Sequence, residues 1–122
     1  MATSQHPAQP VNLAQKASLI NEQWSPRVVA EMNDYQFKVV KLLGDFIWHD
    51  HLDTDETFIV LEGQLRIDFR DGHVLVNAGE MYVVPKGIEH KPCAQQEVKL
   101  LLLVWPGFVG RERICRQLNL RR

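Results

Sequence analysis

The sequence predicts a single all-β domain, a jelly-roll barrel of two antiparallel sheets preceded by a short N-terminal helix. Apolar and polar side chains alternate from Tyr35 to Val39 and from Leu65 to Phe69, which is typical of strands with one buried face. Turn sequences recur every seven to nine residues, at Glu62-Gly63, Asp71-Gly72, Ala78-Gly79 and Lys86-Gly87. The absence of helical stretches between these strands excludes parallel crossovers and favours a sandwich or barrel.

The N-terminal residues are expected to lie outside the barrel. Residues 1–10 include Pro7 and Pro10 and offer little apolar surface to bury, which predicts a disordered leader. Asn12 can cap a short helix that ends near Ile20, with Leu13, Ala17 and Ile20 on one side. The predicted division is leader and helix over residues 1–26, barrel over 27–106 and a basic tail over 107–122.

The stretch from Val98 to Trp105 is apolar at almost every position, with Lys99 as the exception, so we expect burial on both faces. The outer face of a small barrel normally contacts water, and the N-terminal helix or a second subunit is therefore expected to cover it. Together with the segment from Arg27 to Ala30, this apolar surface predicts a homodimer, because large exposed patches mark association.

The tail from Arg111 to Arg122 holds five arginines and one glutamate. Ile114 and Leu118 are spaced for a narrow helical stripe, so a solvated helix or frayed end is the main interpretation, and phosphate or partner binding is the alternative. Cys115 lies among these arginines, which could lower the pKa of its thiol.

Length and composition narrow the function classes. A chain of 122 residues suits one domain, and a net charge of −1 argues against nucleic acid as a partner. No apolar stretch approaches the roughly 20 residues of a membrane span, and the first ten residues lack the features of a signal peptide. A cytoplasmic location is therefore expected. Cys93 and Cys115 are expected to be free thiols.

A candidate metal site lies in the middle of the chain. His49 and His51 are two residues apart, so in a strand their side chains share a face while Asp50 points away. Glu56 begins the next apolar run, and His90 follows much later. Three imidazoles and one carboxylate suit a divalent transition metal such as Zn, Ni, Mn or Fe, bound at about 2.0–2.2 Å. The alternative is a hydrogen-bonded polar cluster without a metal.

Two rival carboxylates, Asp53 and Asp55, lie in the loop before Glu56. Glu56 is preferred because it shares a strand face with Phe58 and Val60, whereas the aspartates are expected to bond loop amides.

Other side chains are expected to lie outside the ligand set. His6 belongs to the leader and His73 adjoins a turn, so neither should bind metal. Trp48 and Cys93 point away from the ligand face by alternation, and Trp48 should pack against an outer layer. Glu89 points outward by the same argument, which leaves no clear general base besides the ligands.

The spacing of these residues carries a family resemblance. One motif has glycine, His-X-His, glutamate after four residues and glycine after six more, at Gly44, His49, His51, Glu56 and Gly63. A second has glycine, five residues, Pro-X-Gly, two residues and histidine, at Gly79, Pro85, Gly87 and His90. Both resemble the cupin motifs, with Ala94 where the family has asparagine. The chain is thus identified as a small single-domain cupin of the conserved-barrel type, similar to mannose-6-phosphate isomerase-like cupins.

The resemblance implies a double-stranded β-helix barrel with a metal bound by His49, His51, Glu56 and His90. One or two coordination positions would remain for water or substrate. With iron, the resemblance implies a dioxygenase, and with zinc, nickel or manganese an isomerase. The alternative is a non-catalytic sensor or binding module. In each case the expected ligand is a small polar molecule such as a sugar or carboxylate.

Overall fold

A computed structural model describes residues 9–105 and 112–117. This part of the chain is mainly β, and all pairings between its strands are antiparallel. The elements are α1 (Leu13–Ser18), β1 (Arg27–Met32), β2 (Tyr35–Asp45), β3 (His49–His51), β4 (Glu56–Glu62), β5 (Gln64–Phe69), β6 (Gly72–Asn77), β7 (Met81–Val84), β8 (His90–Val104) and β9 (Glu112–Ile114). None of the helical structure described there is long and apolar enough to cross a membrane.

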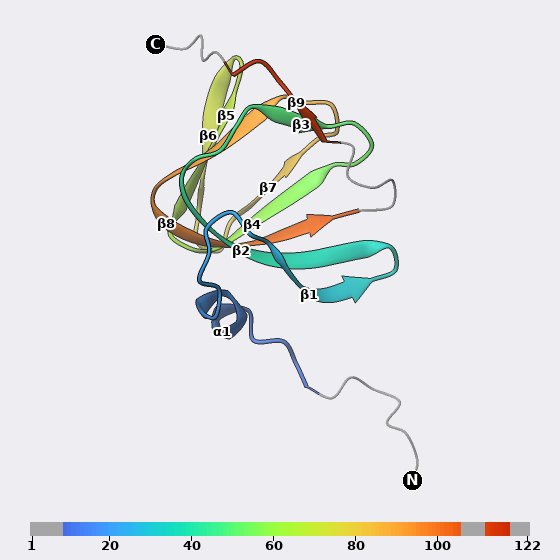
Figure 1. Ribbon diagram of the computed structural model, residues 1–122, viewed down its shortest axis with the longest axis vertical. Helices are drawn as coiled ribbons and strands as arrows, with labels where there is room; N and C mark the ends of the chain where they lie inside the picture. Colours follow the sequence, from blue (N-terminus) through green and yellow to red (C-terminus); the bar gives the residue numbers. More distant parts are fainter. Residues whose placement is uncertain (1–8, 106–111, 118–122) are drawn as a thin grey trace.

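The strands form one continuous nine-stranded sheet, whose two halves share the long strand β8. Its C-terminal part pairs with β2 and β4, and these pair with β1 and β7. Its N-terminal part pairs with β3 and β5, and these pair with β9 and β6. Figure 1 shows the two halves of the sheet enclosing a common interior, with β3 and β9 at one end of the view and α1 at the other. The prediction of an all-β jelly-roll barrel with one short helix is confirmed.

Turns fall where the sequence predicted them, and one glycine is required by its surroundings. The β5–β6 hairpin closes between Phe69 and Gly72, and Gly63 links β4 to β5 with φ +91°. A Cβ at Gly63 would lie 2.9 Å from the Glu97 carbonyl oxygen, closer than real Cβ contacts. A further hairpin, between β1 and β2, was not predicted, and Asn33 adopts φ 54° there.

The barrel core is made by alternate residues of the strands, as the sequence pattern predicts. Leu65 and Ile67 are fully buried, and Ala94 packs in the same cluster, so the position that has asparagine in the motif is apolar core here. The buried core residues are Val40, Leu42, Phe58, Val60, Leu65, Ile67, Val76, Val84, Ala94, Val98 and Leu100.

The N-terminal helix covers part of the outer face of β8. The side chain of Asn12 caps α1 by accepting a hydrogen bond from the Gln15 amide at 3.0 Å. Ala17 and Ile20 are buried and pack with Val39 and Leu101. Of the two covers expected for the apolar strand, the structure therefore shows the helix.

The main interpretation of the C-terminal tail is wrong for the residues that are described. Glu112–Ile114 form strand β9, which pairs with β3 rather than forming a solvated helix or frayed end. An unpaired edge strand leaves backbone donors and acceptors without partners. The backbone of β9 provides such partners for the edge of β3. Residues 1–8 of the predicted leader and residues 106–111 and 118–122 lie outside the described residues.

Candidate metal centre

The fold brings the four predicted ligands together from three strands. His49 and His51 lie on β3, Glu56 is the first residue of β4 and His90 the first of β8. His49 and His90 are direct cross-strand partners, and Glu56 shares its face with the buried residues of β4, as expected from alternation. One ligand atom from each of the four residues lies within 4.8 Å of the others.

The separation of these donors fits one transition-metal ion. Two donors bound at about 2.1 Å each can lie at most about 4.2 Å apart, so no pair of these donors would need to close by more than roughly 0.6 Å. His51 Nε2 lies 3.1 Å and His90 Nε2 lies 3.4 Å from Glu56 Oε1. Side-chain rotation can supply this adjustment without moving the barrel.

Backbone carbonyls fix the orientation of two imidazoles. His49 Nδ1 lies 2.9 Å from the Ile47 carbonyl oxygen, and His90 Nδ1 lies 2.8 Å from that of Ile88. Because a carbonyl oxygen can only accept, each Nδ1 must carry the proton. In the neutral ring Nε2 then has the lone pair that a metal requires, the usual second-sphere arrangement of metal-binding histidines.

The charge balance of the cluster also favours a cation. Burial opposes the ionisation of Glu56, but hydrogen bonds and positive charge from His51 and His90 outweigh it and lower its pKa to about 2. The nearly buried carboxylate is therefore ionised at neutral pH. A divalent ion among the four residues would balance this negative charge.

The rival carboxylates and the other described candidates lie outside the four-residue cluster. Asp55 Oδ1 accepts a hydrogen bond from the Lys86 amide at 2.9 Å, and neither Asp53 nor Asp55 belongs to the cluster. Glu89 points outward and pairs with Arg70 at 3.0 Å. Trp48 is buried under the Arg70 guanidinium, which lies 3.9 Å from its ring centroid.

Both cysteines are free, as expected, and both thiols have raised pKa values. Burial, followed by the charge of Asp68, raises the pKa of Cys93 to about 12. Burial and then the charge of Asp50 raise the pKa of Cys115. The expectation that arginines lower the pKa of Cys115 is therefore wrong, because a carboxylate and desolvation outweigh Arg113.

An apolar cavity of about 250 Å³ reaches the cluster from inside the barrel. Of the described residues that line it, only His49 and Glu56 are ionisable, and both are predicted ligands. The lining consists of Trp24, Pro26, Val40, Leu42, Phe46, His49, Glu56, Phe58, Pro92, Leu100 and Leu102. An apolar cavity of about 150 Å³ is enough to hold benzene, so this one suits a single ring with a short substituent.

Two aromatic side chains that the sequence analysis missed form one wall of this cavity. Trp24 and Phe46 stack with ring centroids 4.9 Å apart and planes inclined by 17°. Trp24 adopts φ 60°, a rare conformation for a bulky residue. It is held by hydrogen bonds from its amide to the Lys41 carbonyl oxygen and from its Nε1 to that of Leu43. The segment before residue 27, predicted to lie outside the barrel, thus contributes to its interior.

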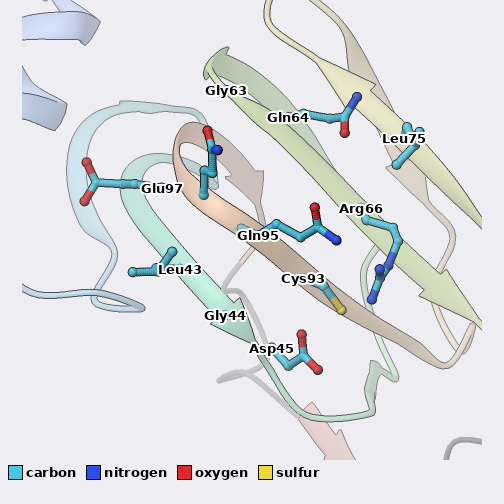
Figure 2. A pocket seen from close by; sticks show the side chains of 12 residues that line it. Leu43, Gly44, Asp45, Gly63, Gln64, Arg66, Leu75, Cys93, Gln95 and Glu97 are labelled. Carbon is cyan, nitrogen blue, oxygen red and sulfur yellow. The ribbon is translucent and has the colours of Figure 1, made fainter.

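A second and larger hollow, about 620 Å³, lies away from the four ligand candidates, none of which lines it. Figure 2 shows Arg66, Cys93 and Asp45 facing this space from three neighbouring strands. Arg66 is paired with the buried Asp68 at 2.9 Å, and Lys91 lies 3.5 Å from Asp45. Since the nearby charges are already paired, this hollow is a weaker candidate for chemistry than the cavity beside the histidines.

Comparison with known proteins identifies the family to which this chain belongs. The model of the Cupin domain family matches residues 39–106, more than half of the chain, so the protein belongs to the cupin family. It is 60% identical to a cupin-2 domain containing protein from Shewanella frigidimarina, with a TM-score of 0.75 over 76% of this chain and 91% of that one.

Two further relatives show the same relationship at lower identity. The crystal structure of a Neisseria meningitidis protein is 37% identical, with a TM-score of 0.73 over 80% of this chain and 99% of that one. The Bacillus subtilis protein YdbB is 38% identical over 81 residues, which are 66% of this chain and 72% of the relative. The names of these proteins assign no reaction, so the function must be argued from the site.

Proposed function

We propose that this cupin binds a divalent transition metal through His49, His51, Glu56 and His90, and beside it a small ligand with one metal-binding oxygen on a compact apolar body. The observation that carries the proposal is the junction of the four-residue cluster with the apolar cavity. The bound metal would act as a Lewis acid or, as iron, as a redox centre. The metal could be Zn, Ni, Mn or Fe, because availability and geometry select it more than ligand type.

The cavity lining favours an oxygenase over an isomerase. Isomerisation of a sugar phosphate needs a base within hydrogen-bond reach of the proton to be moved, and it needs polar partners for the hydroxyl groups. Among the described lining residues, His49 and Glu56 are the ionisable groups, and both are committed to the metal. A dioxygenase places both atoms of dioxygen in its substrate and needs no external reductant, so this site suits it better.

In such a reaction the protein would bind and orient the substrate. The stacked rings of Trp24 and Phe46 offer a flat apolar wall, and Phe58 contacts His90 edge to face with centroids 6.1 Å apart. These side chains would hold the apolar body of the ligand and exclude water from the cluster. A phenol or a short aromatic carboxylate has the required combination of one polar end and one ring.

A non-catalytic binding module is the second candidate, because the described cavity lining contains no acid or base apart from the ligands. Both candidates predict that metal-loaded protein binds such a ligand, and only the oxygenase predicts turnover. The test loads untagged protein with Fe(II) and with Zn(II) and measures binding and oxygen uptake for a phenol, an aromatic carboxylate and a sugar phosphate.

Oxygen uptake with Fe(II) and an aromatic ligand would support the oxygenase, and tight binding without uptake would support the module. Conversion or selective binding of the sugar phosphate would contradict the proposed ligand class. The Phe46→Ala variant provides the matched control for the cavity, because it removes one ring of the wall and no member of the cluster.

We also propose a homodimer. The helix covers Leu101, yet Val28 and Met32 on the edge strand β1 are about half exposed, at 50% and 49%. Tyr35 at the start of β2 extends this apolar edge and is 43% exposed. A second copy that covered these side chains would remove exposed apolar surface at the segment that predicted the dimer. A cytoplasmic location is consistent with two free thiols and is testable by cell fractionation.

A further inference from the structure

Strand β3, which bears His49 and His51, depends on the C-terminal segment for most of its pairing. It has three residues, and its register with β8 consists of the single pair His49–His90. All three positions pair with β9, through His49–Ile114, Asp50–Arg113 and His51–Glu112. Figure 1 shows β9 lying alongside β3.

The same segment also fixes the residue before His49. The Cys115 amide donates to the Trp48 carbonyl oxygen at 2.8 Å, and Gln117 Nε2 donates to the same oxygen at 3.0 Å. The Trp48 amide donates to Gln117 Oε1 at 2.7 Å. Both backbone groups of Trp48 are therefore bonded to the C-terminal segment, which sets the direction in which the chain enters β3.

An ion pair links β9 to the residue between the two histidines. Asp50 is completely buried and points away from the face that His49 and His51 share. Arg113 Nε lies 3.2 Å from one of its carboxylate oxygens, and an Arg113 terminal nitrogen lies 2.5 Å from the other. This is the two-bond fork by which arginine holds a carboxylate.

Removing Arg113 would leave a buried carboxylate without its partner, which is strongly unfavourable. Asp50 could regain hydration only by turning outward. Because Asp50 lies between His49 and His51, that turn would rotate the peptide units that aim both imidazoles.

We infer that Arg113 is a positioning residue of the metal centre: by holding Asp50, it keeps β9 on β3 and aims His49 and His51 at the metal. The inference rests on the proposed metal site. It assigns a role to the C-terminal segment that the cupin motifs do not include, since both motifs end before residue 106. Loss of a group that bonds directly to a metal ligand weakens metal affinity by about 10–100-fold, and Arg113, which acts through Asp50, is expected at the lower end of that range.

The experiment measures the zinc affinity of the full chain by competition with a chromophoric chelator. Arg113→Met removes the fork but keeps an unbranched stem, and we expect it to weaken zinc binding by about tenfold or more. Arg113→Lys should restore part of the loss, because one ammonium replaces the two-bond fork. Arg116→Met is the matched control in the same segment, since the Arg116 side chain is exposed, and it should leave the affinity unchanged.

Wild-type affinity in a folded Arg113→Met variant would overturn the inference and leave the metal site standing. A wild-type protein that bound no zinc would instead overturn the metal site, and the inference with it. If Arg113→Met does not fold, the inference is tested instead by amide hydrogen exchange of the wild-type protein with and without zinc. Zinc should slow exchange of the Cys115 amide if β9 and the metal site are coupled, and an unchanged rate would overturn the coupling.

Discussion

Replacing His51 by alanine should abolish the stabilisation of the protein by metal. The side chain of His51 is 17% exposed, and its partner is Glu56 at 3.1 Å, so the barrel core does not depend on it. At a free metal concentration of about 100 times Kd, binding to the folded state adds about 2.7 kcal/mol. At roughly 4 °C per kcal/mol for a domain of this size, zinc should raise the Tm of the wild type by about 10 °C.

The assay is a thermal melt of each variant with zinc and with a chelator, together with elemental analysis. Comparing the two conditions within one variant cancels the cost of the lost His51–Glu56 hydrogen bond in the apo protein. His73→Ala is the matched control, since it removes an exposed histidine that lies outside the cluster, and it should keep the full shift. An equal zinc shift in His51→Ala, or one retained equivalent of metal, would refute the assignment.

Three other predictions concern Glu56, Gly63 and the proposed dimer. The pKa of Glu56 is lowered from 4.5 to about 2 in the folded protein, so the stability that its carboxylate contributes is complete above about pH 4.5 and is lost as the pH falls through about 2. In urea titrations of the apo protein at different pH values, Glu56→Gln should remove part of this loss of stability in acid. An unchanged dependence of stability on pH would contradict the prediction. Gly63→Ala should destabilise the fold by roughly 1–3 kcal/mol, more than Gly79→Ala, because both have positive φ but only Gly63 would clash; equal midpoints in denaturant would disprove this. Sedimentation should show a dimer that Val28→Lys weakens, and a wild-type protein that sediments only as single chains would end the dimer proposal.

Local patterns in the sequence predicted the strands and the residues of the four-residue cluster, because both depend largely on short spacings. Alternation on a strand places His49 and His51 on one face whatever the rest of the chain does, and it identifies Glu56 by the burial of its own strand. The cap at Asn12 is equally local. These features follow from the two-residue alternation of side chains along a strand or from the preference for certain residues at helix caps, and they require no knowledge of tertiary contacts.

The missed features depend on contacts between distant segments. Trp24 enters the cavity because Lys41 and Leu43 hold it at a positive φ, and no sequence pattern predicts that conformation for tryptophan. Strand β9 pairs with β3 and brings Arg113 to Asp50, 63 residues earlier in the chain. The sequence held one indication of this pairing, the carboxylate of Asp50 between two predicted ligands. A buried Asp50 needs a cation as its partner, and the arginine-rich tail could provide one.

The proposed metal centre therefore has two parts that are held in place by different segments of the chain. Glu56 and His90 begin strands that belong to the barrel itself, with β7 beside β4 and both β3 and β5 beside the first part of β8. His49 and His51 sit on a strand of three residues that the C-terminal segment borders on its other side. A change in that segment can thus alter the orientation of two imidazoles while Glu56, His90 and the apolar walls of the cavity keep their places. Metal affinity and substrate selectivity should respond to different substitutions, the first to Arg113 and the second to Trp24 and Phe46.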